Sequence, residues 1–410
     1  MQTDGNRLSF QGPRGWRVTR FIHTADWQIG KPYRRITDEQ KRFKLQQERL
    51  NVIGRIREAA RTQDAAFALV AGDLFDSATP PNTVVLEVLE AIGEMEIPVL
   101  VIPGNHDHGA LGTVWHREDF QKNQRKMAPN LQLLLERKPV ELDQVVLLPC
   151  PLLRNQDSND PTLWLHCFDW NGLDANKARV VLAHGGVHNF GGREYSLDEE
   201  AQAGSNNLID LTALPHQEID YIALGDWHNL KQISERAWYP GTPEPDRFDQ
   251  GEDNQRGQVL AVDVRRGSIP KIERVPTGRF RWHNLRFRFN SDEDLDRFER
   301  KVEELTDGRV ARDLLRVEVS GSLSLAGHRR YEQIVTELDN RLLRLRLKGE
   351  CQQAPEATEL EQLTGRIEDP LIARVAEKLQ DRLQREDDPD SDEAVLVRTA
   401  LCELFRFTTD

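Results

Sequence analysis

Five short motifs carry side chains that could bind metal ions and assist the cleavage of an ester. Each follows an apolar run: HTADWQ (23–28), AGDLFD (71–76), PGNHDH (103–108), LAHGG (182–186) and ALGDWH (223–228). Carboxylate, amide and imidazole groups are the ligands that hard and borderline divalent cations take in proteins. Two such cations about 3.5–4 Å apart can share a carboxylate, activate a water and neutralise a phosphate. The motifs therefore indicate metal-dependent phosphoester hydrolysis.

The order of the motifs is more informative than any one of them. An isolated Gly-Asp or His-Gly pair is common, and a lone histidine in a turn more often makes a structural hydrogen bond than binds a metal. Five motifs that each end a predicted strand are hard to obtain by chance. The residues that carry most of the prediction are Asp26, Asp73, Asn105, His106, His184 and His228. A structural role, in capping or packing, stays open for His23, His108 and His188.

Apolar runs predict the strands that would position these motifs. The predicted strands are 18–23, 66–70, 97–103, 145–149, 178–184, 220–225 and 258–264. Helical patterns lie near 38–60 and 82–95, between the early strands. This alternation is typical of a layered α/β domain, and the closer spacing of the later strands favours a mixed sheet or a sandwich.

The pattern changes near residue 276, which predicts a second, smaller domain. Its expected strands are 280–289, 314–321 and 343–349. Between the first two we expect a helix over 291–305, capped by Ser291 and ended by Gly308. A polar linker and two amphipathic helices would follow. The expected domains are an N-terminal extension (1–17), a hydrolase domain (18–276), an α/β capping domain (277–350) and a linker with a helical tail (351–410).

Composition excludes several classes of protein. The formal net charge of −13 argues against a domain that coats nucleic acid by bulk attraction, although a nuclease needs basic residues only near its site. No run approaches the ~20 apolar residues of a membrane helix, and the first residues lack the apolar centre of a secretory signal. We therefore expect a cytoplasmic protein without membrane contact. The four cysteines lack CxxC spacing, so neither a disulfide framework nor a zinc ribbon is predicted.

The series of motifs resembles that of the calcineurin-like metallophosphoesterases. Within that family, the stretches HTADWQIGKPY, GDLFDS, PGNHD, LAHGG and WYPGTPEPDRF (238–248) are similar to the SbcD/YhaO-type DNA repair exonucleases. The resemblance implies a four-layer αββα sandwich with a small α/β capping domain and a C-terminal helical tail.

The resemblance also implies a ligand set for two divalent cations. One would be held by Asp26, Gln28, Asp73 and His228, and the other by Asp73, Asn105, His184 and Asp226, with Asp73 bridging. His106 would be the catalytic imidazole and Asp107 its orienting partner. Two of these positions depart from the family pattern, because Gln28 and Asp226 stand where the wider family has histidines.

These departures predict a harder metal site. Gln28 can still bind a cation through its amide oxygen, and Asp226 adds a negative charge, so Mn²⁺, with Mg²⁺ as the alternative, is favoured over Zn²⁺. The added charge should also make a bound water less acidic, which predicts an alkaline-leaning pH profile. The other interpretation is that the altered ligands weaken one metal position.

The substrate and the partners are expectations from the resemblance. It implies 3′→5′ exonuclease and single-strand endonuclease action in DNA repair, with an SMC-like coiled-coil ATPase bound through the C-terminal helices. It also implies a homodimer formed by helices near 82–96 and 112–126. The candidate substrate contacts are Lys31, Arg34, Arg35, Phe75 and Arg247, and Trp27 and Trp227 could stack on bases or simply pack. The alternatives are a phosphodiesterase for nucleotides or other small phosphoesters, and a structural subunit with a weakened site.

Overall fold

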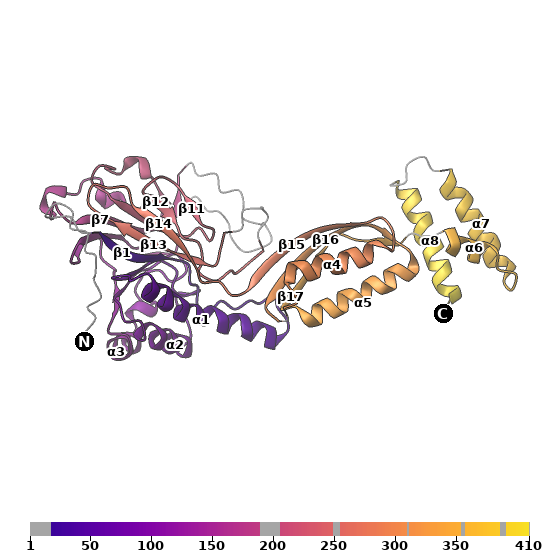
Figure 1. The fold of residues 1–410 in the computed structure, drawn as a ribbon, viewed down its shortest axis with the longest axis horizontal. Coiled ribbons are helices and arrows are strands. Elements are labelled where there is room, and N and C mark those ends of the chain that lie inside the picture. The colour runs from indigo at the N-terminus through magenta and orange to yellow at the C-terminus, as the bar shows by residue number, and fades with distance from the viewer. Residues whose placement is uncertain are drawn as a thin grey trace, which may run out of the picture. The chain divides into compact units, whose positions relative to one another are not determined.

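The computed structural model divides into two compact units, Met1–Arg279 and Phe280–Asp410. It describes residues 18–188, 206–248, 255–309, 311–353, 357–385 and 391–409, so the expected N-terminal extension lies outside the described residues. Figure 1 shows the two β-rich layers of the first unit and the helices that follow its early strands.

The first unit is built on two six-stranded sheets. One has the order β14 (Lys271–Pro276), β13 (Gln258–Val264), β1 (Thr19–Thr24), β2 (Ala68–Ala71), β3 (Val99–Ile102) and β4 (Leu131–Leu133). The other has the order β11 (Lys231–Gln232), β12 (Ala237–Tyr239), β10 (Tyr221–Gly225), β7 (Ala178–His184), β6 (Val145–Cys150) and β5 (Val140–Glu141). The short strands β8 (Gly186–Val187) and β9 (Leu208–Ile209) form a separate two-stranded parallel sheet. In the first sheet, β1 to β4 are parallel, and β13 and β14 are antiparallel at one end. The second sheet has a parallel centre and two antiparallel edge strands, so the predicted mixed α/β fold is confirmed.

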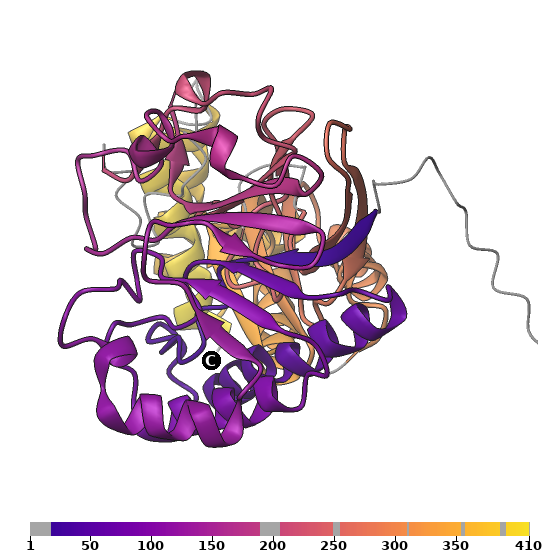
Figure 2. The same ribbon diagram turned by 90° about the vertical axis from the view of Figure 1, so that its left-hand side faces the viewer.

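Alternating side chains of the central strands form two apolar layers. Phe21, Leu69 and Leu100 of the first sheet share one core with Val180 and Tyr221 of the second, so the sheets pack face to face. The opposite face of the first sheet is covered by α1 (Glu39–Thr62), α2 (Asn82–Gly93) and α3 (Glu118–Met127). Figure 2 shows these indigo and purple helices along one side of the stacked strands.

The outer face of the second sheet has a different cover. Its apolar side chains pack against short 3₁₀ turns at Leu163–Leu165, Trp170–Gly172 and Leu211–Ala213. In the described part of the first unit, the outer layer on this side is therefore made of turns and loops, whereas longer helices cover the first sheet.

The second unit begins with a parallel sheet. Its strands are β15 (Arg281–Phe289), β16 (Asp313–Leu323), β17 (Arg344–Lys348) and β18 (Gln352–Gln353). The helices α4 (Asp294–Thr306) and α5 (Leu325–Arg341) pack on it through Phe298 and Ile334.

The start of α4 differs from the prediction. Ser291 does not cap it with its side chain; the N-cap residue is Glu293, and the carbonyl oxygen of Ser291 accepts from the Asp294 N–H. The end of the helix follows Thr306, where Asp307 and Gly308 both have left-handed backbone angles (φ 51° and 63°). A glycine there tolerates this conformation, as predicted.

Within residues 357–385 and 391–409, the chain forms three helices, one more than expected. They are α6 (Ala357–Thr364), α7 (Pro370–Gln384) and α8 (Asp392–Thr409), and α6 occupies part of the segment predicted as linker. Leu363, Ala376 and Leu401 are buried between them, because each helix has an apolar side that the others cover. None of the helices in the described ranges is long and apolar enough to cross a membrane.

Candidate metal centre

The predicted ligands gather where parallel strands end. Asp26 follows β1, Asp73 follows β2 and Asn105 follows β3, while His184 ends β7 and Asp226 follows β10. The carboxyl ends of these strands meet at one edge because β1, β2 and β3 run parallel, as do β7 and β10. The five motifs, which are far apart in the sequence, therefore lie together at the carboxyl ends of the strands that the apolar runs form.

Strained backbone aims the side chains of this site. Asp26 (φ 54°), Gln28 (43°), Asp73 (55°) and Asp226 (102°) all have positive φ angles, which residues with a Cβ rarely adopt. Such residues cost ~1–3 kcal/mol each and persist only where the surroundings hold them. The Asp26 N–H donates to the carbonyl oxygen of Gly72 at 3.1 Å, and the Gln28 N–H donates to that of Asp73 at 2.8 Å. The first two motif loops thus hold each other.

Two motif glycines allow the loops to approach closely. A Cβ on Gly72, where φ is +87°, would lie 2.2 Å from His184 Nδ1. A Cβ on Gly104 would lie 2.2 Å from Asp73 Oδ1 and 2.6 Å from the Asp73 backbone nitrogen. The glycines of the GD and GNHD motifs are therefore required by packing around the ligands.

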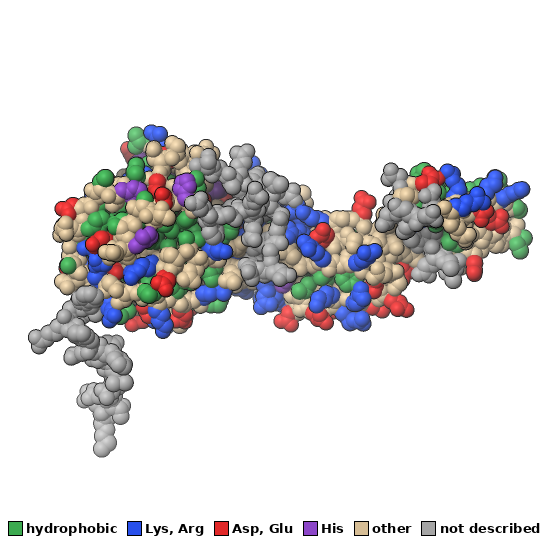
Figure 3. Space-filling view, turned by 90° about the horizontal axis from the view of Figure 1, so that it is seen from above, with side chains coloured by type: hydrophobic (Ala, Val, Ile, Leu, Met, Phe, Trp, Pro, Cys, Tyr) green, Lys and Arg blue, Asp and Glu red, His purple; other side chains and the backbone are tan. Residues whose placement is uncertain are grey.

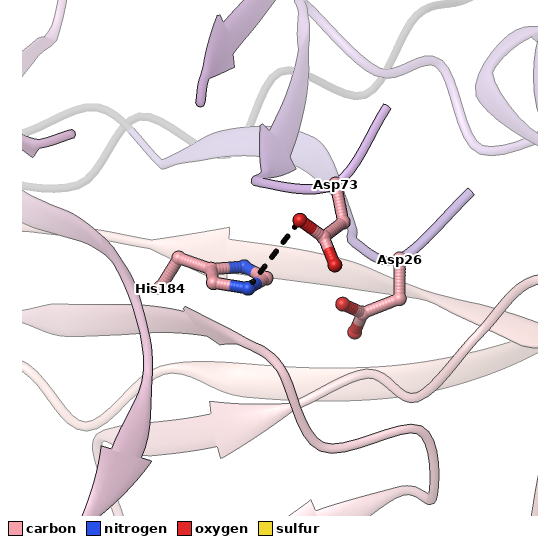
Figure 4. Close-up of side chains that lie close together, drawn as sticks. All are labelled: Asp26, Asp73 and His184. Atoms are coloured by element: carbon pink, nitrogen blue, oxygen red, sulfur yellow. Dashed lines mark ion pairs between the residues drawn. The ribbon is translucent and has the colours of Figure 1, made fainter. Parts of the chain in front are cut away.

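Asp26, Asp73 and His184 form the core of the site. Their ligand atoms all lie within 4.8 Å of one another, and Figure 4 shows both carboxylates beside the imidazole ring. His184 Nδ1 donates to the Ala71 carbonyl oxygen at 2.7 Å, so the lone pair of a neutral ring is on Nε2. Nε2 lies 3.7 Å from Asp73 Oδ1, 3.7 Å from Asp226 Oδ1 and 3.0 Å from Asn105 Oδ1.

The electrostatics of this core fit a divalent cation. Burial raises the pKa of Asp26 to about 8; His184 opposes the rise, while Asp73 and Asp226 add to it. Burial lowers the pKa of His184, but Asp73, Asp26 and Asp226 together raise it to about 9. Without a cation the site holds protons to offset its negative charge, and a metal ion would replace them. The donor set of Asp26, Asp73 and His184, with Asn105 and Asp226 beside it, therefore fits one cation.

His228 and Gln28 lie on the other side of Asp73. The amide nitrogen of Gln28 lies 3.4 Å from both Asp73 Oδ2 and His228 Nε2. The amide oxygen accepts from Lys31 Nζ at 2.9 Å. An ammonium group can only donate, so this contact fixes which end of the amide faces which neighbour. We expected the oxygen to face a metal, and in the structure it faces Lys31 instead.

His228 is held as a neutral imidazole. Burial and the nearby Arg247 lower its pKa to about 3, although Asp246 opposes them. Its Nδ1 lies 3.1 Å from Asp246 Oδ2. A carboxylate behind a histidine fixes the ring orientation and the tautomer in many metal sites.

His106 lies beside the core with its ring partly exposed. Its backbone N–H donates to Asp73 Oδ1 at 2.9 Å, and its Nδ1 donates to the Asp76 carbonyl oxygen at 3.0 Å. Its Nε2 lies 4.0 Å from Asp73 Oδ2, and the side chain is 41% exposed. Burial lowers the pKa of His106, but the charge of Asp73 and the Asp76 carbonyl outweigh this and raise it. The ring can therefore carry a proton at the mouth of the site.

Asp107 makes different contacts from those expected of a partner that orients the His106 ring. Its carboxylate accepts from the backbone N–H groups of Gly104 at 2.7 Å and Phe75 at 3.1 Å, so it joins the second and third motif loops. The partner of the His106 ring is the carbonyl oxygen of Asp76 rather than Asp107. Asp107 supports the site through the backbone and does not orient the imidazole.

The candidate substrate contacts differ in accessibility. Phe75 is fully buried against Trp115, with ring centroids 5.5 Å apart, so the prediction that it contacts substrate is wrong. Lys31 and Arg247 both pair with the buried Asp246, at 3.3 and 3.0 Å. Arg34 and Arg35 are exposed. On the face drawn in Figure 3, basic and acidic side chains of the described residues lie interspersed.

Trp27 and His23 are structural. Trp27 is buried and its indole N–H donates to Thr24 Oγ1 at 2.9 Å, so its ring is not available for stacking on a base. His23 is buried between the sheets, where it contacts the Tyr221 hydroxyl at 2.8 Å and the Leu224 carbonyl oxygen at 3.1 Å.

Two residues of the site were not found from the sequence. Arg49 of α1 is 1% exposed, and its guanidinium donates to the carbonyl oxygens of Asp26 and Gln28, each at 3.1 Å. An arginine on the apolar side of a helix was the available signal. Asp246 is buried among Lys31, His228 and Arg247; it lies in the late WYPGTPEPDRF stretch, which the resemblance had singled out.

Comparisons with known proteins identify the family of this chain. The calcineurin-like phosphoesterase family matches residues 19–254. One solved structure is 12% identical, covers 64% of this chain and 100% of its own, and has a TM-score of 0.37. A second, GAP50, the anchor in the inner membrane complex of Plasmodium, is 12% identical, covers 63% of this chain and 89% of its own, and has a TM-score of 0.33. Because the family match spans more than half of the chain and every motif of the site, the chain belongs to the calcineurin-like phosphoesterases.

Proposed function

We propose that this protein is a metal-dependent phosphodiesterase that cleaves DNA. The observation that carries the proposal is the buried cluster of Asp26, Asp73 and His184 with the protonatable His106 at its mouth. The family supports phosphoester hydrolysis, and the likeness of the motifs to SbcD/YhaO-type nucleases supports DNA as the substrate and a 3′→5′ direction.

A bound divalent cation would lower the pKa of a water and offset the negative charge of the phosphate. Asp26, Asp73 and His184 would hold it, and Asn105 and Asp226 lie close enough to complete its surroundings. This oxygen-rich set favours Mn²⁺, with Mg²⁺ as the alternative. His184 can bind only through Nε2, because its Nδ1 proton is held by Ala71.

His106 is suited to protonate the leaving group. The carbonyl oxygen of Asp76 holds the Nδ1 proton, which leaves Nε2 of the protonated ring to face the ester. A water oxygen forms its bond to phosphorus and gives up a proton to solvent as the P–O bond to the leaving group breaks. The electron pair of that bond stays on the departing oxygen, which takes the Nε2 proton. The ring is left neutral and regains a proton from solvent. Such general acids contribute typically about 10²–10⁴-fold to a rate.

The tail and the helices of the first unit suggest partners. Leu371 (73% exposed) and Val375 (40%) lie one turn apart on α7, and Ile367 (91%) precedes them. We propose that this apolar strip binds the coiled-coil base of an SMC-like ATPase.

We also propose a homodimer that forms through α2 and the segment around 112–126. Leu86 (37% exposed) lies on α2, and Leu111 (88%) directly precedes the second segment.

One panel of substrates tests the proposed activity. The full chain with Mn²⁺ should degrade single-stranded DNA and duplex DNA with free ends, and Asp73→Asn should abolish the cleavage. Hydrolysis of only a cyclic nucleotide or a chromogenic diester would favour a small-molecule phosphodiesterase. Absence of any turnover by a folded chain would favour a structural subunit.

A further inference from the structure

Lys31, Gln28, His228 and Asp246 form a closed ring of polar contacts beside Asp73. Lys31 Nζ lies 2.9 Å from Gln28 Oε1 and 3.3 Å from Asp246 Oδ2. Gln28 Nε2 lies 3.4 Å from His228 Nε2, and His228 Nδ1 lies 3.1 Å from the same Asp246 oxygen. Gln28, His228 and Asp246 are buried, and the Lys31 side chain is only 22% exposed.

Lys31 fixes the orientation of the Gln28 amide in this ring of contacts. Lys31 only donates, so Gln28 must turn its oxygen toward Lys31 and its NH₂ group toward His228 and Asp73. His228 Nε2 faces this NH₂ group, and its Nδ1 lies 3.1 Å from Asp246 Oδ2 and 3.0 Å from Arg247 Nη2. Each polar group in the ring has a partner without a cation.

This arrangement occupies one side of the centre. Asp73 Oδ2 and His228 Nε2 are the atoms that would bind the cation expected on this side, and both face the Gln28 NH₂ group. To admit a cation, the amide would have to turn its oxygen inward. Its NH₂ group would then face the Lys31 ammonium, so two donors would meet in a buried place. The ammonium would also repel the cation.

We propose that this centre binds one divalent cation, at Asp26, Asp73 and His184, and that Gln28 and Lys31 take the place of a second. The inference deepens the proposed function, since it concerns the same site, but it is independent of what the protein cleaves. It replaces the expectation of two cations. Lys31 places a positive charge behind the Gln28 amide, on the side of the centre where the second cation was expected.

Counting bound Mn²⁺ tests the proposal. The chain is stripped with a chelator and dialysed against Mn²⁺, and metal per chain is measured by elemental analysis together with the electron paramagnetic resonance spectrum. The wild type should hold about one ion per chain with the hyperfine pattern of an isolated Mn²⁺. The double variant Gln28→His, Lys31→Met should hold about two, with the signature of an exchange-coupled pair.

A matched control separates the position of Lys31 from its charge. Lys44 is exposed on α1, so Lys44→Met makes the same charge change away from the site and should leave the count unchanged. Circular dichroism and a thermal melt confirm that each variant is folded. Lys31→Met alone should allow the amide to turn and raise the count above that of the wild type.

Two outcomes would overturn the inference. One is a wild-type chain with a coupled pair of ions; the other is a folded double variant that still binds a single ion. Failure to cleave DNA would not affect either measurement, so a protein that holds one ion and leaves DNA intact would refute the proposed substrate alone.

Discussion

Arg49 Nη2 donates to the carbonyl oxygen of Asp26 at 3.1 Å, so a buried cation of α1 holds the backbone that presents the first carboxylate. The same guanidinium donates to the carbonyl oxygen of Gln28 at 3.1 Å and to Thr242 Oγ1 at 3.0 Å. One side chain thus joins the first motif loop to the loop that carries Asp246. The positive φ angles of Asp26 and Gln28 depend on such external support.

Replacement of Arg49 should destabilise the site and the fold. In Arg49→Met, the carbonyl oxygens of Asp26 and Gln28 each lose a charged donor and keep only Thr242 Oγ1 and the Lys31 N–H. A hydrogen bond to a charged group contributes ~1.5–3 kcal/mol. We expect the free energy of unfolding in urea to fall by about 3 kcal/mol or more, and the Mn²⁺ affinity to fall with it. Arg57→Met, which removes a surface pair with Glu94, should change stability by less than about 1 kcal/mol. Equal effects of the two variants would contradict this role.

The close approach of the Gly104 backbone to the Asp73 carboxylate predicts that a larger residue at position 104 disturbs metal binding. Gly104→Ala puts a methyl group 2.2 Å from Asp73 Oδ1, so the carboxylate must move and Mn²⁺ binding should fall at least about tenfold. Gly54→Ala is the control, because Gly54 lies within α1 and has nothing within 4 Å of the added Cβ. That variant should keep its metal affinity and gain roughly 0.5–1 kcal/mol of stability. Calorimetric titration with Mn²⁺ and urea unfolding measure both effects.

The positions of the motif residues were predictable because two signals agree. Apolar runs predicted the strands before Asp26, Asp73 and Asn105, and polar residues at the ends of parallel strands must lie near one another. The environment of each side chain was less predictable. Phe75 follows a ligand in sequence, yet its ring packs on Trp115, which lies forty residues further along the chain in a separate turn.

The orientation of the Gln28 amide could not be predicted from the sequence. Its residue type alone allowed an oxygen ligand, and the position of Lys31 in the same loop was visible in the sequence. What turns the amide is the placement of Lys31 against Asp246, 3.3 Å away and on a distant loop. That contact exists only after the first sheet and the late loop have come together.

The buried charges of the core predict how pH acts on the metal-free protein. The pKa of Asp26 is raised from 3.8 to about 8 and that of His184 from 6.5 to about 9. Both groups bind protons more tightly when folded, so the stability they contribute is complete below their unfolded pKa values. It is lost as pH rises to about 8 for Asp26 and about 9 for His184. The melting temperature of the chelator-treated chain should therefore fall between pH 7 and pH 9.

Bound Mn²⁺ should flatten that dependence, because the cation replaces the protons. Asp26→Asn removes one of the two groups and should make the metal-free slope smaller. His23 and His228 do not disturb the test, since burial lowers the pKa of each to about 3 and they are neutral throughout this range. A metal-free melting temperature that rises from pH 7 to pH 9 would contradict the assignment.

His106 should separate catalysis from metal binding. Its ring is 41% exposed and lies outside the triad, while its contribution to Asp73 comes from the backbone N–H, which every residue except proline retains. We expect His106→Ala to lower turnover about a hundredfold or more, because the leaving oxygen loses its proton donor. The Mn²⁺ content should stay near that of the wild type, whereas Asp73→Asn should lose both metal and activity. A substrate with a leaving group that needs no proton should restore much of the His106→Ala rate, and equal loss of metal and turnover in that variant would show that His106 supports the metal site instead.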